Sequence, residues 1–180
     1  MNTFPVVMLT RKLLGRFVER QKSKNLAKGG AIINLSSVNA LLPLAGRAMY
    51  SAGKKFDEYF TYGVDMAYYK AVDSLCVKPA FVSTPLNLHR KIDMFTTDIK
   101  TCASDSLRAL GNIDRTFGAK KHIVLGFVLE CVLWLLMTIP EAGRKKLTDL
   151  IAYKLLKVNR HKPEENSQIN RADSPSKKTK

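Results

Sequence analysis

The chain has 180 residues, of which 46% are hydrophobic, and its formal net charge is +15. This length allows one sizeable core and does not favour two full domains. The charge suits an anionic partner, but aromatic residues are not interleaved with the basic ones, which does not favour a nucleic-acid partner.

The cysteines and histidines restrict the chemistry further. Cys76, Cys102 and Cys131 are odd in number, far apart and in largely apolar surroundings. We expect reduced thiols in the core, not a disulfide framework, and chemistry that faces the cytosol. The three histidines lack the spacing of metal ligands, so the sequence implies no metal.

The elements of the first hundred residues follow an α/β order. An amphipathic helix is predicted to begin near Pro5. The run AIINLSS, residues 31–37, is apolar and β-branched, which is typical of a strand buried on both faces of a parallel sheet. A second helix is predicted from Tyr50 to about Tyr69, and AVDSLCVKPAF, residues 71–81, predicts the next strand.

The rest of the chain is more varied in composition. A polar stretch beyond Pro85 precedes a predicted helix from about Asp98 to Leu110. Residues 122–139 form the most apolar segment, at the lower limit of length for a bilayer span, and Glu130 at its centre would be costly there. For this segment, a core or membrane-surface helix and a true membrane-spanning helix are both possible interpretations. Residues 161–180 predict a disordered basic tail.

Three side chains near the first predicted strand indicate carbonyl chemistry. Tyr50 and Lys54 are one helical turn apart, where an ammonium group favours the phenolate form of a tyrosine. Ser37 stands at the carboxyl end of the predicted strand, where open α/β sheets bind ligands, so its hydroxyl could hold a carbonyl oxygen against the phenol. The alternative is an ordinary helix start with an exposed lysine, because Tyr153 also has a lysine four residues on, Lys157.

The motifs GGAIINLSS, MYSAGKKF and LCVKPAFVSTPL resemble the catalytic half of the short-chain dehydrogenases/reductases, over roughly residues 2–155. Within that family the sequence looks most similar to the branch of 17-beta-hydroxysteroid dehydrogenases and very-long-chain 3-oxoacyl-CoA reductases. The resemblance implies an incomplete Rossmann-like, doubly wound parallel sheet with C-terminal hydrophobic helices. We therefore divide the chain into a catalytic half, 1–120, a membrane-associating or substrate-capping helical region, 121–160, and the tail, 161–180.

The resemblance also implies roles for single residues. Tyr50 would be the proton donor, Lys54 its electrostatic partner and a ribose ligand, and Ser37 the group that binds the carbonyl. Asn2 matches the asparagine that supports the family's proton relay, with a plain helix cap as the alternative.

The segment PAFVST, residues 79–84, resembles the one that contacts the nicotinamide in this family. Pro79, Val82 and Thr84 are therefore expected to bind cofactor together with Tyr50 and Lys54, and Thr84 would bond the carboxamide unless it only caps a helix. The family's usual glycine after the proline is Ala80 here. None of the ten glycines forms the glycine-rich turn that holds the pyrophosphate.

The absence of the glycine-rich nucleotide-binding motif affects what we expect of the chain and its function. We expect a fragment or incomplete gene model more than a natural truncation, and a half sheet that exposes an apolar strand edge and helix faces. The first hypothesis is an NAD(P)(H)-dependent oxidoreductase for the carbonyl or hydroxyl of a lipid, either a 3-oxoacyl-CoA in fatty acid elongation or a 17-keto or hydroxy steroid. NADP(H) is favoured over NAD(H) by resemblance alone. The alternative is a non-catalytic, membrane-associated scaffold.

The end of the chain bears on location. The last four residues, KKTK, resemble the dilysine retrieval signal of endoplasmic reticulum membrane proteins, with an ordinary basic tail as the alternative. Together with the apolar segment they indicate the endoplasmic reticulum membrane, with the catalytic part facing the cytosol. A homodimer stays open.

Overall fold

The structure is a computed structural model that describes residues 3–42, 46–85, 89–143, 145, 146 and 150. The chain divides into two compact units, Met1–Pro140 and Glu141–Lys180. In the second unit the described residues are helical, and the Lys145 ammonium lies 2.7 Å from the Glu141 carboxylate. Asn2 and the predicted tail, residues 161–180, lie outside the described residues.

The first half of the chain follows the predicted order of elements. Helix α1 covers Thr3–Ser23, strand β1 Gly30–Leu35 and helix α2 Ala48–Tyr68, and strand β2 covers Val72–Val77. The predicted bounds of these helices and strands are confirmed to within a few residues. A short 3-10 helix, η1, Val38–Leu41, fills part of the loop after β1.

Short strands and two helices make up the rest of the first unit. They are β3, Phe81–Val82, β4, Thr96–Thr97, α3, Ile99–Ala109, β5, Arg115–Thr116, and α4, Lys120–Met137. Helix α3 starts where predicted because the carboxylate of Asp98 accepts a hydrogen bond from the backbone N–H of Thr101 at 2.9 Å.

The main sheet has the order β1-β2-β5, and both of its pairings are parallel. Gly30 is in register with Val72, and Leu35 with Val77. A second, two-stranded parallel sheet joins β3 to β4. Because parallel neighbours need crossover connections, the helices between the strands follow directly from this pairing. The predicted α/β fold with a parallel sheet is confirmed.

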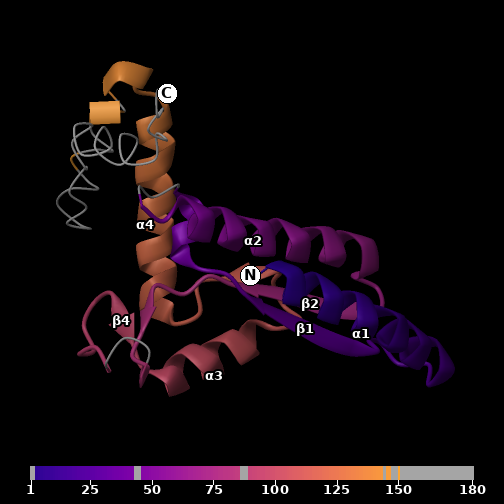
Figure 1. Cartoon of the computed structure of the whole chain (residues 1–180). Coiled ribbons are helices and arrows are strands. Elements are labelled where there is room, and N and C mark those ends of the chain that lie inside the picture. Colours follow the sequence, from indigo (N-terminus) through magenta and orange to yellow (C-terminus); the bar gives the residue numbers. More distant parts are fainter. Residues whose placement is uncertain (1–2, 43–45, 86–88, 144, 147–149, 151–180) are drawn as a thin grey trace, which may run out of the picture. The chain divides into compact units, whose positions relative to one another are not determined.

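Helices lie on both faces of the main sheet. Figure 1 shows α1 and α2 running side by side along the strands, and Asn34 of β1 faces them, since its side-chain amide donates to the Thr61 hydroxyl of α2 at 2.8 Å. Neighbouring strand residues point to opposite faces. Leu35 and its register partner Val77 therefore face the other way, where α3 packs close to Gly118, beside Val77 and Cys102.

The prediction that β1 is buried on both faces is wrong. Ile32 and Asn34 are buried, but Ile33 is 37% and Leu35 62% exposed. Two features explain this. β1 is the edge strand of the sheet within the described residues, and α3 packs on the β5 side, away from it. The apolar strand edge that the sequence predicted is present.

The apolar segment forms α4, and its central charge has a partner. The carboxylate of Glu130 lies 3.5 Å from the ammonium of Lys78, which is 1% exposed just after β2. Across the part of the chain that the structure describes, no helix has the length and apolar character needed to cross a membrane. The expectation of core thiols holds for Cys76, which is buried, but is wrong for Cys131, which α4 exposes.

Candidate functional site

The candidate site lies where β1 and β2 end. The backbone ladder continues past both strands, with Ser36 N–H donating to the Val77 carbonyl at 2.8 Å and Val38 N–H to the Pro79 carbonyl at 3.1 Å. Ser37 lies between these two bonds and caps η1, where its hydroxyl accepts from the Asn39 N–H at 3.2 Å. The serine is therefore held at the carboxyl edge of the sheet, as the sequence predicted.

Tyr50 reaches the same place from α2. It lies in the first turn of that helix and is 42% exposed. A cavity of about 420 Å³ is lined by Ser37, Val38, Asn39, Arg47, Tyr50, Ala80 and Phe81. The structure thus brings two of the three residues of the predicted carbonyl site, Ser37 and Tyr50, to one cavity. A hydroxyl and a phenol that share a cavity can hydrogen-bond to one carbonyl oxygen.

Lys54 is placed beside this cavity and faces the end of β1. Its ammonium donates to the Leu35 carbonyl at 2.5 Å and lies 3.1 Å from the fully buried carboxylate of Asp57. The Ser36 hydroxyl donates to the Lys54 carbonyl at 2.6 Å, so Ser36 ties the end of β1 to α2. Lys54 is not among the described residues that line the cavity. The contacts with Leu35 and Asp57 hold the ammonium of Lys54, which belongs to the turn of α2 after that of Tyr50.

The segment 79–84 borders the cavity through residues other than those predicted. Ala80 and Phe81 line it, whereas Pro79, Val82 and Thr84 are not among its described lining residues. Pro79 uses its carbonyl in the ladder to Val38, and Val82 pairs with Thr97 in the small sheet. The Thr84 carbonyl accepts from the His89 N–H at 3.0 Å.

Arg47 and Phe81 are among the lining residues that escaped the sequence prediction. Arg47 stands at the amino-terminal cap of α2, three residues before Tyr50, a spacing that could have revealed a shared helix face. Phe81 also lines the cavity, and the guanidinium carbon of Arg90 lies 4.2 Å from its ring centroid. No sequence pattern predicts that Phe81 lines the cavity, because its position depends on the pairing of β3 with β4.

Other chemistry near the site is less suitable. Burial raises the pKa of the Cys76 thiol to about 12, so this residue stays protonated and is a poor nucleophile. Among the residues that the structure describes, no group of three histidine, cysteine or acidic side chains could hold a metal ion.

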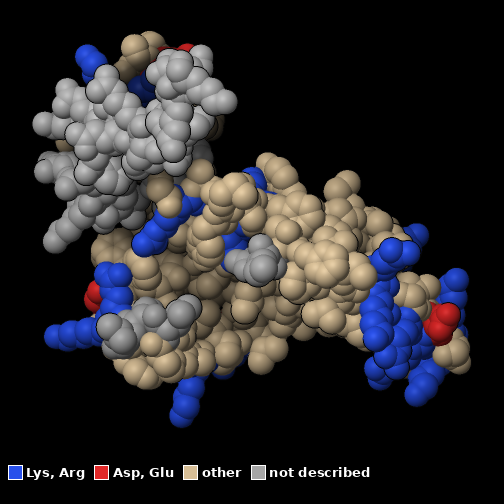
Figure 2. All heavy atoms as spheres, viewed as in Figure 1, with Lys and Arg blue, Asp and Glu red and all other residues tan. Residues whose placement is uncertain are grey.

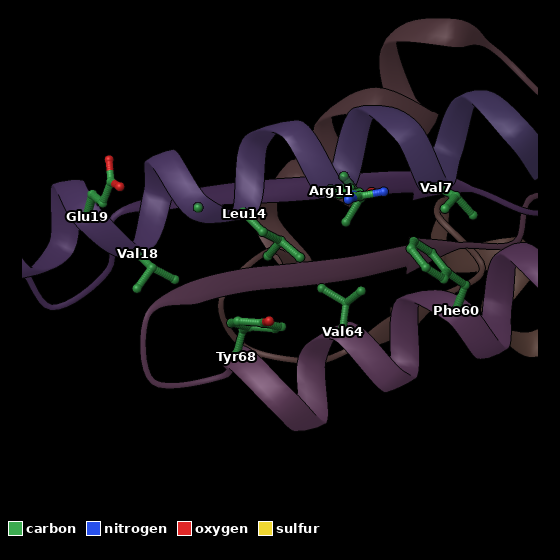
Figure 3. Close-up of a pocket in the computed structure, with 10 residues that line it drawn as sticks. Val7, Arg11, Leu14, Val18, Glu19, Phe60, Val64 and Tyr68 are labelled. Carbon is green, nitrogen blue, oxygen red and sulfur yellow. The ribbon is translucent and has the colours of Figure 1, made fainter.

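A second cavity, of about 490 Å³, lies between α1 and α2 (Figure 3). Val7, Leu14 and Val18 of α1 point across it toward Phe60, Val64 and Tyr68 of α2. Arg11 and Glu19 also line it, and its lining is otherwise mostly aliphatic and aromatic. This mostly apolar lining offers few groups that could transfer a proton, so the cavity at Ser37 and Tyr50 is the candidate site.

The predicted homodimer stays a prediction.

Comparison with known proteins agrees with the motifs at this site. The family model described as short chain dehydrogenase matches residues 1–94. The chain belongs to the short-chain dehydrogenase family. Its relatives place it in the branch of 17-beta-hydroxysteroid dehydrogenases and very-long-chain 3-oxoacyl-CoA reductases.

The similar proteins are longer than this chain. A zebrafish (Danio rerio) 17-beta-hydroxysteroid dehydrogenase type 3 is 33% identical over 76% of this chain and 43% of its own length. The human very-long-chain 3-oxoacyl-CoA reductase is 31% identical over 72% of this chain and 39% of its own length. A putative steroid dehydrogenase 3 of Caenorhabditis elegans is 30% identical, over 74% and 42%. The chain therefore spans about two fifths of the length of these relatives.

Among solved structures, a short-chain dehydrogenase from Streptomyces avermitilis is similar, with a TM-score of 0.40 and 19% identity, covering 96% of this chain and 60% of that one.

The family implies a nicotinamide cofactor, and the described residues fit one end of it. Tyr50, Ala80 and Phe81 line a cavity at the carboxyl edge of the parallel sheet, the place where open α/β sheets bind nucleotides. The described glycines offer no glycine-rich turn after a strand for the pyrophosphate. Within the described residues, the groups that could meet such a cofactor are those that line this cavity.

Proposed function

We propose that this chain supplies the proton-transfer half of an oxidoreductase site that interconverts a carbonyl and a hydroxyl group on a lipid-like substrate. One observation carries the proposal: Ser37 and Tyr50 line a single cavity at the carboxyl ends of β1 and β2, in a member of the short-chain dehydrogenase family. A nicotinamide, when bound, supplies the hydride in this chemistry.

Each residue has a role that its position allows. The Ser37 hydroxyl hydrogen-bonds to the substrate oxygen and orients it toward Tyr50. The Tyr50 phenol gives its proton to that oxygen in reduction and takes one back in oxidation. Lys54 lies one helical turn from Tyr50, with its ammonium held at the Leu35 carbonyl and the Asp57 carboxylate, and supplies the positive charge beside the site.

The finer parts of the proposal rest on the relatives and the sequence. NADP(H) is the proposed cofactor form. A 3-oxoacyl-CoA or a 17-keto or hydroxy steroid is the proposed substrate, because the named relatives are reductases and dehydrogenases of these two kinds. The endoplasmic reticulum membrane, with the site facing the cytosol, is the proposed location.

The experiment compares Tyr50→Phe with Tyr59→Phe in the full-length protein. Tyr59 lies on the same helix, is 65% exposed and does not line the described cavity, so it is a matched control. Carbonyl-dependent oxidation of NADPH should fall roughly 100- to 10,000-fold in Tyr50→Phe, the usual contribution of a general acid, and stay unchanged in Tyr59→Phe. Full turnover by Tyr50→Phe would refute the role of this tyrosine.

A further inference from the structure

Arg47 is the charged residue among the described residues that line the candidate cavity. The rest of that lining is either polar, Ser37, Asn39 and Tyr50, or apolar, Val38, Ala80 and Phe81. No acidic residue belongs to the described lining. A substrate whose reacting oxygen lies at Tyr50 therefore shares the cavity with a permanent positive charge.

Arg47 differs from the other cations around the site, because those cations have acidic partners. The ammonium of Lys54 lies 3.1 Å from the Asp57 carboxylate. Arg90, which stacks on an aromatic lining residue, lies 4.0 Å from the Asp93 carboxylate. Arg47 is exposed, and no carboxylate of the described residues comes within 4.0 Å of its guanidinium. Its planar fork of N–H donors can therefore serve a ligand in the cavity.

The cavity thus has two polar points for one substrate. In the proposed function, Ser37 and Tyr50 meet the oxygen that is reduced or oxidised, and Arg47 can meet an acceptor close to it. In a 3-oxoacyl thioester the thioester carbonyl is separated from the 3-oxo group by a single methylene group, and the coenzyme A arm beyond it carries phosphates. A 17-keto steroid has only hydrocarbon next to its ketone. The thioester therefore matches both polar points, and the steroid matches only the first.

The apolar lining residues do not choose between these substrates, because an acyl chain and a steroid ring both suit hydrophobic side chains. Arg47 does discriminate. A steroid in the cavity would take water away from the guanidinium without giving it an acceptor, which costs free energy. A thioester would give it a charge-assisted hydrogen bond. One residue can therefore favour the first substrate and disfavour the second.

The charge of the whole chain acts in the same direction over longer distances. The formal net charge is +15, and Figure 2 shows much more lysine and arginine than acidic surface on the face in view. A surface of this kind attracts anionic ligands and speeds their encounter with the protein. A coenzyme A thioester is anionic through its phosphates, whereas a 17-keto steroid is neutral. Long-range attraction therefore also favours the thioester.

We propose that Arg47 is a specificity-determining residue, which binds the thioester arm of a 3-oxoacyl substrate and makes the site prefer acyl thioesters to steroid ketones. This inference rests on the proposed function, because it assigns the reacting oxygen to Ser37 and Tyr50, and it goes further by choosing between the two proposed substrates. The acceptor is an oxygen of the thioester carbonyl or of the coenzyme A phosphates, and the experiment separates these two sources.

The experiment measures kcat/KM of the full-length wild type and of Arg47→Met with three substrates. They are a 3-oxoacyl-CoA, the N-acetylcysteamine thioester of the same acyl chain, which has no phosphates, and a 17-keto steroid. For the 3-oxoacyl-CoA, Arg47→Met should lower kcat/KM roughly 10- to 100-fold, the worth of a hydrogen bond to a charged group, mainly by raising KM. The loss for the steroid should be the smallest of the three.

The N-acetylcysteamine thioester identifies the acceptor. A loss that it shares with the 3-oxoacyl-CoA assigns the contact to the thioester carbonyl, and a loss confined to the 3-oxoacyl-CoA assigns it to the phosphates. Arg47→Lys keeps the charge without the planar fork, so it should recover only part of the loss. Arg16→Met is the matched control, because Arg16 is an exposed arginine of α1 outside the described lining, and it should behave as the wild type. Equal losses for all three substrates, or no loss for either thioester, would overturn the proposal.

A binding measurement separates this inference from the proposed function. Calorimetric titration of Tyr50→Phe with the 3-oxoacyl-CoA should give a Kd that the added Arg47→Met change weakens roughly 10- to 100-fold. Full turnover by Tyr50→Phe, together with a Kd that still depends on Arg47, would refute the proton-transfer role and leave the specificity residue in place. A Kd that Arg47→Met does not change would overturn the role of Arg47 and leave that of Tyr50 intact.

Discussion

The ammonium of Lys78 lies 2.8 Å from a carboxylate oxygen of Glu58, and both side chains are almost fully buried. The same ammonium is 3.5 Å from Glu130 and 4.7 Å from the centre of the Phe117 ring. Lys78 follows β2, Glu58 belongs to α2 and Glu130 to α4. This one cation therefore joins three elements next to the segment that borders the candidate site.

Replacing Lys78 by methionine should destabilise the protein by about 3–5 kcal/mol, because it leaves the buried Glu58 carboxylate with less compensation. Lys55→Met is the matched control. Lys55 also pairs with Glu58, at 2.9 Å, but from a partly exposed position, where such pairs contribute about 1 kcal/mol or less. The free energies of unfolding in urea give the comparison. Equal losses for the two variants would contradict the special role of the buried cation.

Acid should weaken the fold through Glu58. Burial alone would raise the pKa of this carboxyl, but the hydrogen bonds and charges of Lys78 and Lys55 outweigh burial and hold the pKa below its usual value. The unfolded state then binds the proton more readily, so stability from Glu58 is present above the ordinary pKa of about 4.3 and is lost as pH falls below it. Glu58→Gln should flatten the loss of unfolding free energy on acidification, as denaturant titrations at successive pH values would reveal. A slope as steep as that of the wild type would disprove this assignment.

His122 should act in a higher pH range. Burial lowers its pKa below the ordinary value and the charge of Lys121 acts in the same direction, against the hydrogen bond with the Phe95 carbonyl. A histidine with a depressed pKa in the fold takes up its proton more readily when unfolded. Its contribution is therefore complete above about pH 6.5 and declines as pH falls below that value. Unfolding free energies between neutral and mildly acidic pH should lose this decline in His122→Phe. Persistence of the decline would point to another group.

Two helical glycines should respond oppositely to alanine. A Cβ at Gly126 would come within 2.4 Å of the Phe117 ring, whereas one at Gly63 of α2 would meet nothing within 4 Å. Gly126→Ala should cost about 1–3 kcal/mol through overpacking, and Gly63→Ala should gain about 0.5–1 kcal/mol through helix propensity. Thermal unfolding of both variants makes the comparison. Stabilisation by Gly126→Ala would show that α4 packs more loosely against Phe117.

Local patterns were sufficient to predict much of the fold. Helical periodicity located α1 and α2, and the β-branched run located β1. The burial of β1 could not be predicted, because composition shows that a strand suits two covered faces but does not show which elements cover it. Ile33 and Leu35 are exposed because α3 packs toward β5.

The candidate site was predictable where it depended on helix and strand spacing. Ser37 and Tyr50 were both named from such spacing, and they share a cavity. The ammonium of Lys54 was expected near the phenol, but its bonds to Leu35 and Asp57 depend on the packing of α2 against β1, which spacing does not encode. Phe81 was missed for the same reason, since it reaches the cavity through a pairing between distant strands.

The central claim is that Ser37 and Tyr50 act on one substrate oxygen. The most direct measurement is kcat/KM for carbonyl reduction by Ser37→Ala, Tyr50→Phe and the double variant. Residues that act as a unit are strongly non-additive, so the double variant should be little slower than Tyr50→Phe alone. Losses that multiply fully in the double variant would mean that the serine and the tyrosine act independently, which would contradict the shared site.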